Sequence, residues 1–371
     1  MRIAINTRFL IKDKLEGIGI YTHELSKNLV QLLPEHDFYF LFDRSFSSDF
    51  IFGNNVQPLV VSPPARHPFL WYWWFEYSIP KVFQQNKIDV FFSPDGFCSL
   101  STNIKQILTI HDIGFERFPE HTPFLVRNYY RHFTPKYCHK AQRIFTVSKF
   151  TKQEISTVYN IPSNKIEVAY NAFENTSNSS SKNVHQIDSR LSSQIPYFIF
   201  VGAVHPRKNV LGLLKAFEYF KSNFSQQHQL VIVGRKAWLN KNVEDFYQKM
   251  RFKNDVVWIE QIQREDLIHL TQQSFAMVYP SWYEGFGIPV LEAMQLGVPV
   301  IASNTTSLPE ITGDAALLIS PNETIEIAMA MQRLIEDKML RNQLIEKGKK
   351  QAQQFIWKTS AMKIANALTQ F

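Results

Sequence analysis

The residues between Tyr279 and Ser303 have types and spacing that suit the binding of an anion. An apolar strand pattern runs into the loop EGFG at 284–287, and Pro289 suits the first helical position, where its missing N–H costs nothing. A glycine loop that leads into a helix N-terminus presents backbone N–H groups and the positive end of the helix dipole. This segment therefore predicts a site for a diphosphate.

Two glutamates belong to this segment, Glu284 in the loop and Glu292 on the first turn of the helix. Phosphate would repel a carboxylate, so we expect both side chains to accept hydrogen bonds from sugar hydroxyls instead. The spacing alone would equally fit an exposed surface pair. The strand–loop–helix context favours a binding site.

The elements that position this segment follow from the hydrophobic pattern of the chain. Buried strands are predicted at 2–6, 38–43, 58–61, 88–92, 106–110, 143–147, 166–169, 197–204, 229–233, 256–260, 275–280, 298–302 and 315–319. Helices are predicted at 20–33, 71–86, 122–141, 208–221, 264–273, 289–296 and 323–354. Strands that alternate with helices indicate α/β domains with parallel sheets covered on both faces.

One polar insert divides the pattern. Residues 174–195 include the run ENTSNSSSKN and have no apolar periodicity, which is typical of an exposed linker. We therefore expect an N-terminal Rossmann-like domain at 1–173 and a C-terminal one at 196–356.

Composition excludes several classes of protein. The 371 residues are 45% hydrophobic, with no apolar run near the ~20 residues that a membrane span needs. We read the N-terminus as a buried strand rather than a signal peptide, and expect a cytoplasmic protein. The net charge of +7 comes without dense Lys/Arg runs, so it suits phosphate ligands or an anionic membrane surface and argues against nucleic acid.

Missing motifs narrow the chemistry further. There is no Asp-x-Asp to clamp a metal-bound diphosphate, no Gly-x-Gly-x-x-Gly after the first strand and no P-loop. The two cysteines, Cys98 and Cys138, form no Cys-x-x-Cys or Cys/His cluster. We expect no metal site and no cofactor.

Five segments lie along the chain in a fixed order, the last of them within 279–303: GIGIY at 17–21, TIHD at 109–112, VSKFT at 147–151, VG…PRKN at 201–209 and GVPV at 297–300. Together with 279–303 they closely resemble the motifs of the family 4 retaining glycosyltransferases. That family has the GT-B fold of two facing Rossmann-like domains. The resemblance implies that the last helix, 357–371, returns to the N-terminal domain, which binds the acceptor, while the C-terminal domain binds the nucleotide sugar.

The resemblance also implies roles for residues of the C-terminal half. Glu292 would bind the ribose hydroxyls and Glu284 a hydroxyl of the donor sugar, while Arg207 and Lys208 would stabilise the leaving diphosphate. Ala203 stands where many members carry another arginine, which puts more weight on Arg207. Backbone contacts to sugar, diphosphate or nucleotide would come from Gly202, Ile262, Gly285, Phe286, Gly287 and Leu291.

In the N-terminal half the resemblance makes His111 a contact to the donor sugar, supported by Asp112. A lone histidine after a strand is more often structural, and the family match reverses that expectation. Gly17 and Gly19 would approach the donor phosphate closely, although a plain turn before a helix would also explain them.

The aromatic block at 69–75, FLWYWWF, has two interpretations. Aromatic rings between apolar and wet surroundings suit lipid headgroups or an acceptor sugar. The alternative, which we favour, is a helix packed on the N-terminal sheet.

The sequence therefore predicts an enzyme that moves a hexose from a nucleotide diphosphate sugar, UDP-glucose or GDP-mannose, with retention and without a metal. The acceptor would be a saccharide or a lipid-linked saccharide in bacterial polysaccharide synthesis, with peripheral contact to the inner face of the plasma membrane. A nucleotide-sugar 2-epimerase and a non-catalytic nucleotide-sugar-binding protein are the alternatives.

Overall fold

The computed structural model describes residues 1–174, 184–192, 194–224, 227–236 and 241–370. The chain forms two compact units. The first comprises Met1–Asn171 together with Ile356–Phe371, and the second comprises Ala172–Phe355. The domain limits expected from the sequence were 1–173 with 357–371, and 196–356.

The first unit is built on a parallel sheet with the order β3-β2-β1-β4-β5-β6-β7. Its strands are β1 (Arg2–Asn6), β2 (Asp37–Phe42), β3 (Val56–Val60), β4 (Val90–Ser93), β5 (Lys105–Ile110), β6 (Arg143–Thr146) and β7 (Ile166–Val168). In register, Ile3 pairs with Phe38 on one side and with Val90 on the other. Continuous apolar runs such as DFYFLF in β2 form these strands because a parallel sheet is buried on both faces.

The second unit has a parallel sheet with the order β10-β9-β8-β11-β12-β13. Its strands are β8 (Tyr197–Val201), β9 (Gln229–Val233), β10 (Val256–Ile259), β11 (Ala276–Tyr279), β12 (Val300–Ser303) and β13 (Ala316–Ile319). In both sheets the strand order reverses beside the first strand, at β1/β4 and at β8/β11. Ligands of open α/β sheets bind at the carboxyl ends of strands at such reversals.

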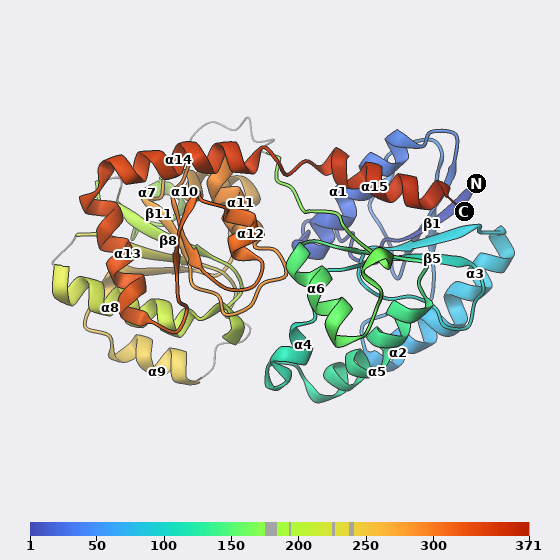
Figure 1. The fold of residues 1–371 in the computed structure, drawn as a ribbon, viewed down its shortest axis with the longest axis horizontal. Helices are drawn as coiled ribbons and strands as arrows, with labels where there is room; N and C mark the ends of the chain where they lie inside the picture. Colours follow the sequence, from blue (N-terminus) through green and yellow to red (C-terminus); the bar gives the residue numbers. More distant parts are fainter. Residues whose placement is uncertain (175–183, 193, 225–226, 237–240, 371) are drawn as a thin grey trace. The chain divides into compact units, whose positions relative to one another are not determined.

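Helices cover both faces of each sheet (Figure 1). In the first unit they are α1 (Gly17–Leu32), α2 (Pro68–Trp73), the π-helical turn η2 (Trp74–Ser78), α3 (Ile79–Asn86), α4 (Gly114–Arg117), α5 (Phe124–Lys140), α6 (Lys149–Val158) and α15 (Trp357–Thr369). In the second they are α7 (Val184–Ile187), α8 (Val210–Phe224), α9 (Lys241–Lys249), α10 (Arg264–Gln272), α11 (Ile288–Gln295), α12 (Leu308–Thr312), α13 (Thr324–Glu336) and α14 (Lys338–Ala352). Short 3-10 turns lie at η1 (Ser48–Phe50), η3 (Pro119–His121), η4 (Ser163–Lys165), η5 (Pro206–Lys208) and η6 (Lys253–Asp255).

The predicted fold class is confirmed: two parallel sheets with helices on both faces. The prediction of one continuous helix at 323–354 is wrong. Asp337 leaves the helical conformation and caps α14, its side chain accepting a hydrogen bond from Leu340 N at 2.8 Å, so the segment forms α13 and α14. An aspartate favours this position because its carboxylate satisfies a backbone N–H at the start of the second helix.

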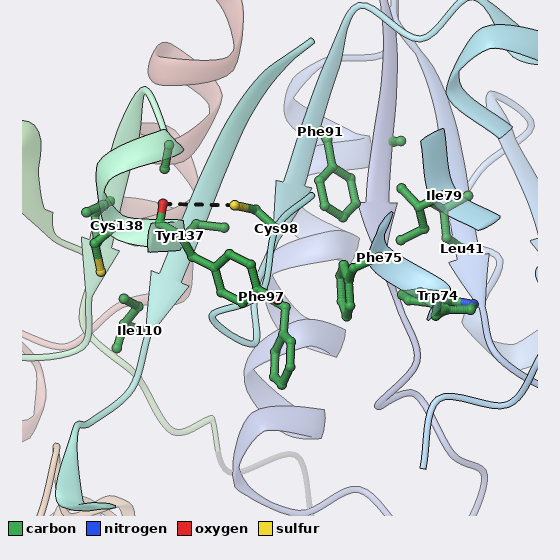
Figure 2. Packing of buried hydrophobic residues seen from close by; sticks show 14 of the residues in the cluster. Leu41, Trp74, Phe75, Ile79, Phe91, Phe97, Cys98, Ile110, Tyr137 and Cys138 are labelled. Atoms are coloured by element: carbon green, nitrogen blue, oxygen red, sulfur yellow. Dashed lines mark hydrogen bonds between the residues drawn. The ribbon is translucent and has the colours of Figure 1, made fainter. Parts of the chain in front are cut away.

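The core of the first unit lies between its sheet and the helices α2, α3 and α5. Figure 2 shows Trp74, Phe75 and Ile79 packed over the strands, with Phe97 and Tyr137 beside them. The two cysteines are free and buried here, and the Cys98 thiol donates a hydrogen bond to Tyr137 O at 3.9 Å. Burial raises the pKa of the Cys98 thiol well above its ordinary value. The thiol therefore stays protonated and unreactive, and the side chain serves only to pack the core.

The last helix, α15, packs on the first unit. Trp357 is buried against the ring of Tyr21 on α1, with ring centroids 5.9 Å apart. Ser360 Oγ donates to Tyr170 O and Lys363 Nζ donates to Val168 O, each at 2.7 Å. The helix is therefore part of the N-terminal unit.

The polar insert at 174–195 departs from the expected exposed linker over its described C-terminal part. Leu191 is buried, and the guanidinium of Arg190 donates to Trp258 O at 3.0 Å. This stretch therefore packs on the second unit. Residues 175–183 and 193 lie outside the described part of the chain.

Candidate active site

The predicted catalytic residues of the second unit gather at the β8/β11 reversal. Arg207 and Lys208 follow β8, and Glu284 follows β11. Because β8 and β11 are neighbours in the sheet, their carboxyl ends bring side chains together that are far apart in the sequence. This is the position at which an open α/β sheet holds a ligand.

Lys208 and Glu284 form a buried ion pair. Lys208 Nζ lies 2.5 Å from Glu284 Oε1 and donates to the hydroxyl of Tyr279 at 2.6 Å. Only 14% of the lysine side chain and 7% of the glutamate side chain are exposed. Burial, reinforced by the charge of Glu284, raises the pKa of Tyr279 well above its ordinary value, so this hydroxyl stays protonated.

The turn that carries Arg207 and Lys208 is fixed at both ends. His205 precedes η5, and its Nδ1 accepts a hydrogen bond from Arg207 N at 3.3 Å. Asn209 follows it in the left-handed conformation, with φ 55°, and its amide donates to Pro321 O at 2.7 Å. Trp282 N donates to Arg207 O at 2.8 Å, which ties this turn to the loop after β11. These contacts therefore fix the backbone of the turn that carries both cations.

The glycine loop leads into α11 as predicted. Gly287 precedes the helix with φ 104°, and an added Cβ would lie 2.6 Å from Leu308 Cδ2, so only glycine fits here. Ser307 Oγ donates to both Glu284 O and Phe286 O at 2.9 Å, which fixes the loop. The Phe286 side chain is buried against Phe355, so that residue can offer a ligand only its backbone.

Leu291 is placed differently from the expectation of a backbone contact to the diphosphate. Its N–H donates to Gly287 O at 3.3 Å inside the helix. The first N–H groups of a helix have no intrahelical acceptor, so an anion at this end of α11 would meet N–H groups nearer to Gly287 and Ile288.

Glu292 is buried on α11 and forms a two-point ion pair with Arg264. The guanidinium donates through Nη2 to Oε1 and through Nη1 to Oε2, the latter at 3.3 Å. Arg264 is the first residue of α10, and its guanidinium also lies 5.3 Å from the Phe173 ring centroid. Ile262 lies half-buried in the loop between β10 and α10. Arg264 therefore connects the predicted ribose contact with the loop predicted to face the base.

Gly202 ends β8 in close contact with a second glycine. A Cβ added to Gly234, which follows β9, would lie 1.9 Å from Gly202 O. Gly202 N donates to Val233 O at 2.8 Å. The two strand ends approach so closely that a side chain at Gly234 cannot fit, and this approach sets the path of the chain toward Arg207.

In the first unit, His111 follows β5 and is anchored by its ring. Its Nε2 lies 2.8 Å from Pro94 O, and because a carbonyl can only accept, Nε2 carries the proton. Nδ1 is then the acceptor of the neutral ring. Burial lowers the pKa of His111, so the ring is uncharged at neutral pH. Asp112 Oδ1 accepts a hydrogen bond from Gly114 N at 2.9 Å.

Gly17 and Gly19 lie in the first turn of α1 rather than in a loop before a helix at 20–33. A Cβ at Gly19 would lie 2.9 Å from Phe9 O, so a side chain there would displace backbone. Gly17, with φ 30°, has no atom within 4 Å of such a Cβ. Close packing thus explains Gly19, and space for a neighbour remains at Gly17.

Two family models match the chain. The one described as "Glycosyltransferase Family 4" covers residues 15–175, and the one described as "Glycosyl transferases group 1" covers residues 182–351. The O-antigen chain mannosyltransferase B of Escherichia coli is 30% identical over 96% of this chain and 97% of that protein. This chain belongs to the family 4 glycosyltransferases.

Two further likenesses agree with the assignment. The glycosyltransferase is 27% identical to the O-antigen chain mannosyltransferase RfbU of Salmonella typhimurium over 72% of each chain. A sucrose-phosphate synthase from Thermosynechococcus elongatus superposes with a TM-score of 0.78, at 18% identity, over 100% of this chain and 98% of that one. The structural likeness shows the GT-B type of fold.

Sequence reasoning missed three residues at the site of this glycosyltransferase: Tyr279, Arg264 and Gly234. Tyr279 lies at the end of a predicted strand, and its place at the carboxyl end of β11 is a usable signal. Arg264 and Gly234 contact residues of other helices or strands. No pattern in the sequence around either residue indicates such a contact.

The N-terminal unit has its own polar cluster at the β1/β4 reversal. Arg8 Nε lies 2.6 Å from Asp95 Oδ2, and both side chains are buried. The Arg8 guanidinium also lies 4.3 Å from the Phe97 ring centroid. Asp95 Oδ1 accepts from Ser93 Oγ at 2.9 Å, and Arg8 N donates to Asn6 Oδ1 at 3.3 Å, so contacts from both strands fix the ion pair.

Among the described residues there is no cluster of three or more His, Cys, Asp or Glu side chains arranged to hold a metal ion. Within the same part of the chain, no helix has the length and apolar character needed to cross a membrane.

Proposed function

We propose that this glycosyltransferase is a retaining mannosyltransferase that uses GDP-mannose and acts in the assembly of a bacterial surface polysaccharide. The observation that carries the proposal is the likeness, along nearly the whole chain, to an O-antigen chain mannosyltransferase. RfbU, whose name gives the same activity, supports it. The acceptor is a saccharide or a lipid-linked saccharide presented at the inner face of the plasma membrane.

The Lys208–Glu284 pair has the chemistry to hold the donor at both sides of the bond that breaks. The ammonium carries three N–H donors, so it can keep Glu284 while donating to a diphosphate oxygen. Glu284 Oε2 then accepts from a hydroxyl of the sugar. Because the two charges neutralise one another, the glutamate does not repel the incoming diphosphate. Arg207 adds charge to the leaving diphosphate as it departs.

The nucleotide is bound by Glu292 and the loop at Ile262. Each carboxylate oxygen of Glu292 has two acceptor positions, and Arg264 uses one on each oxygen. The remaining positions suit the two neighbouring hydroxyls of ribose. His111 Nδ1 accepts a hydrogen bond from a hydroxyl of the sugar.

Transfer with retention follows from departure and attack on one face of the sugar. The bond between C1 and the diphosphate oxygen breaks, and the acceptor oxygen bonds to C1 from the same side. The proton of the acceptor hydroxyl passes to the departing diphosphate. The step needs no enzymic nucleophile, and we assign none.

Calorimetric titration with GDP-mannose, GDP, UDP-glucose and UDP tests the donor, and we expect binding of the guanine nucleotides alone. The anomeric configuration of the product, read by NMR with an acceptor saccharide, tests retention. Binding of UDP-glucose in preference would identify a glucosyltransferase. Conversion of donor without any acceptor would identify an epimerase, and tight binding without turnover would identify a binding protein.

A further inference from the structure

The aromatic block of the first unit divides into two sets of side chains. Residues 68–86 form one helical run through α2, η2 and α3. Trp74 and Phe75 are fully buried and belong to the core (Figure 2). The packing interpretation is therefore right for these two. It does not explain the residues on the outer side of the same run.

Four aromatic side chains of this run are exposed: Phe69 at 72%, Tyr72 at 39%, Trp73 at 49% and Tyr77 at 54%. We call them the aromatic stripe, since residues three or four apart share a helix face. The Tyr77 ring lies 5.0 Å from Trp73 and 6.1 Å from Tyr72, measured between centroids. These three rings therefore form one continuous surface, and Phe69 is exposed one helical turn before them.

The aromatic stripe continues onto α5. The Tyr72 ring lies 5.7 Å from Phe133, and Lys136 Nζ lies 5.6 Å from the same Phe133 ring. Figure 1 shows α2 and α5 next to one another in this unit. Rings and a lysine ammonium thus share one surface.

The charge around the stripe is positive. Helix α5 contains no Asp or Glu, and its cations are Arg127, Arg131, Lys136 and Lys140. Between Arg66 and Asn86 the only carboxylate is Glu76, which is buried and accepts from Leu100 N and Ser101 N. Lys81 lies exposed one turn beyond Tyr77. Of these cations, Arg131 is neutralised by Glu116 at 2.8 Å.

We infer that the aromatic stripe and its flanking lysines dock this unit on an anionic lipid surface. Trp and Tyr rings prefer the level of lipid headgroups, and lysines beside them are attracted to negatively charged lipids. A second copy of the chain fits less well, because a symmetric contact would place like charges opposite one another. A saccharide alone fits less well too, because these side chains are largely exposed, whereas small-molecule sites enclose most of their ligand.

Docking of this kind would hold the enzyme where a lipid-linked acceptor is presented. This role of docking rests on the proposed function, whereas the binding of the aromatic stripe to vesicles does not. The proposed function and the lipid-binding inference can therefore be disproved independently. Donor binding measured in solution tests one, and vesicle binding without donor tests the other.

The test is sedimentation of the full-length protein with vesicles of phosphatidylcholine alone or with 30% phosphatidylglycerol. We expect binding only to the anionic vesicles, weakened by 0.5 M NaCl because salt screens surface charge. Each basic side chain near an anionic surface strengthens binding about fivefold, so Lys81→Glu with Lys136→Glu should weaken it by about 30-fold or more. Trp73→Ala with Tyr77→Ala should weaken it by about tenfold or more.

A matched control is Lys338→Glu with Met339→Ala on α14, which removes an exposed lysine and an exposed apolar side chain from the other unit. It should bind vesicles as the wild type does. Circular dichroism of every variant checks folding, and the charge reversals, which alter exposed side chains only, separate docking from loss of structure. The inference is overturned if wild-type protein ignores anionic vesicles, if both stripe variants bind normally, or if the stripe instead mediates dimers that Trp73→Ala dissolves without lipid.

Discussion

Lys208 Nζ lies 2.5 Å from Glu284 Oε1, so the residue proposed to stabilise the leaving group is held by the residue proposed to bind the sugar. The two come from turns at the ends of adjacent strands. Neither can be altered without leaving the other's charge buried. This coupling changes how substitutions at the site should be read.

Lys208→Ala should lower both stability and transfer. Removal of one partner of a buried pair costs about 3–5 kcal/mol of the free energy of unfolding, because the remaining carboxylate is uncompensated. Lys208→Met with Glu284→Gln should recover much of this stability, measured by denaturant titration, while transfer stays at least about 100-fold below the wild type.

Arg207→Ala should reduce transfer by a similar factor with little change in stability. Near-normal transfer in Arg207→Ala would contradict the diphosphate assignment.

Arg264→Ala should weaken the binding of the free nucleotide diphosphate about tenfold, as should Glu292→Gln, since a charged hydrogen bond contributes roughly 1.5–3 kcal/mol. Glu284→Gln should leave that affinity nearly intact while impairing transfer. Calorimetry with GDP and UDP measures all three.

A second readout separates positioning by Arg264 from simple loss of structure. Without the guanidinium, the buried Glu292 carboxylate loses the cation that positions both of its oxygens. Nucleotide affinity of Arg264→Ala should therefore fall below that of the wild type while its circular dichroism spectrum stays unchanged. Arg264→Lys, which keeps the charge but not the two-point geometry, should lie between them. If Arg264→Ala binds nucleotide more tightly than wild type, the arginine competes with ribose and our assignment is wrong.

Gly234→Ala should destabilise the second unit by several kcal/mol or prevent folding, because the new Cβ would lie 1.9 Å from Gly202 O. Gly313→Ala is the control in the same unit. Its φ of 54° is also positive, so alanine is strained there too, but the new Cβ would meet only the Gln351 side chain at 3.4 Å, so the cost should be about 1–3 kcal/mol and below that of Gly234→Ala. Thermal unfolding followed by circular dichroism compares them. Equal costs would show that backbone conformation, not the close approach, decides.

Acid should destabilise the second unit through His228. This ring is buried among Phe198, Phe220 and Phe275, and burial, together with the nearby Lys221 and Arg341, lowers its pKa to about 4. Unfolded histidine binds a proton near pH 6.5, so between pH 6.5 and 4 the unfolded state holds more protons and stability falls as the pH falls.

His228→Phe should flatten this dependence, as measured by denaturant titration at pH 7 and pH 5. His139→Gln, which changes an exposed histidine of the other unit, should leave the dependence unchanged. An unaltered pH dependence in His228→Phe would show that other groups are responsible.

Transfer should not require a divalent metal, because Lys208, Arg207 and the N-terminus of α11 supply the positive charge that a diphosphate needs. Turnover measured in excess EDTA should equal turnover in buffer alone. A strict need for Mg²⁺ or Mn²⁺ would mean that the diphosphate is held in another way.

The sequence predicted the sheets well because a strand buried on both faces is a continuous apolar run, as in LVIV at 230–233. The glycine loop before α11 was equally visible, since Pro289 and Gly297 mark the two ends of the helix. The break at Asp337 was missed because the hydrophobic pattern continues through it.

Partners in other elements could not be predicted in this way. Arg264 and Glu292 lie on different helices, and the need for glycine at Gly234 arises from the backbone of a neighbouring strand. Such requirements exist only once the chain has folded. For the same reason, the sequence alone could not predict which rings of the aromatic block are buried and which are exposed.

The packing of α15 on the first unit has a consequence for folding during synthesis. Trp357 fills the space against Tyr21, yet it leaves the ribosome only after the whole second unit has been made. The unit that begins first is therefore completed last, and until then its α1 surface is uncovered. Nascent chains that end before Trp357 should be cleaved by protease in the first unit more readily than in the second, and this order of protection can be followed with stalled ribosomes.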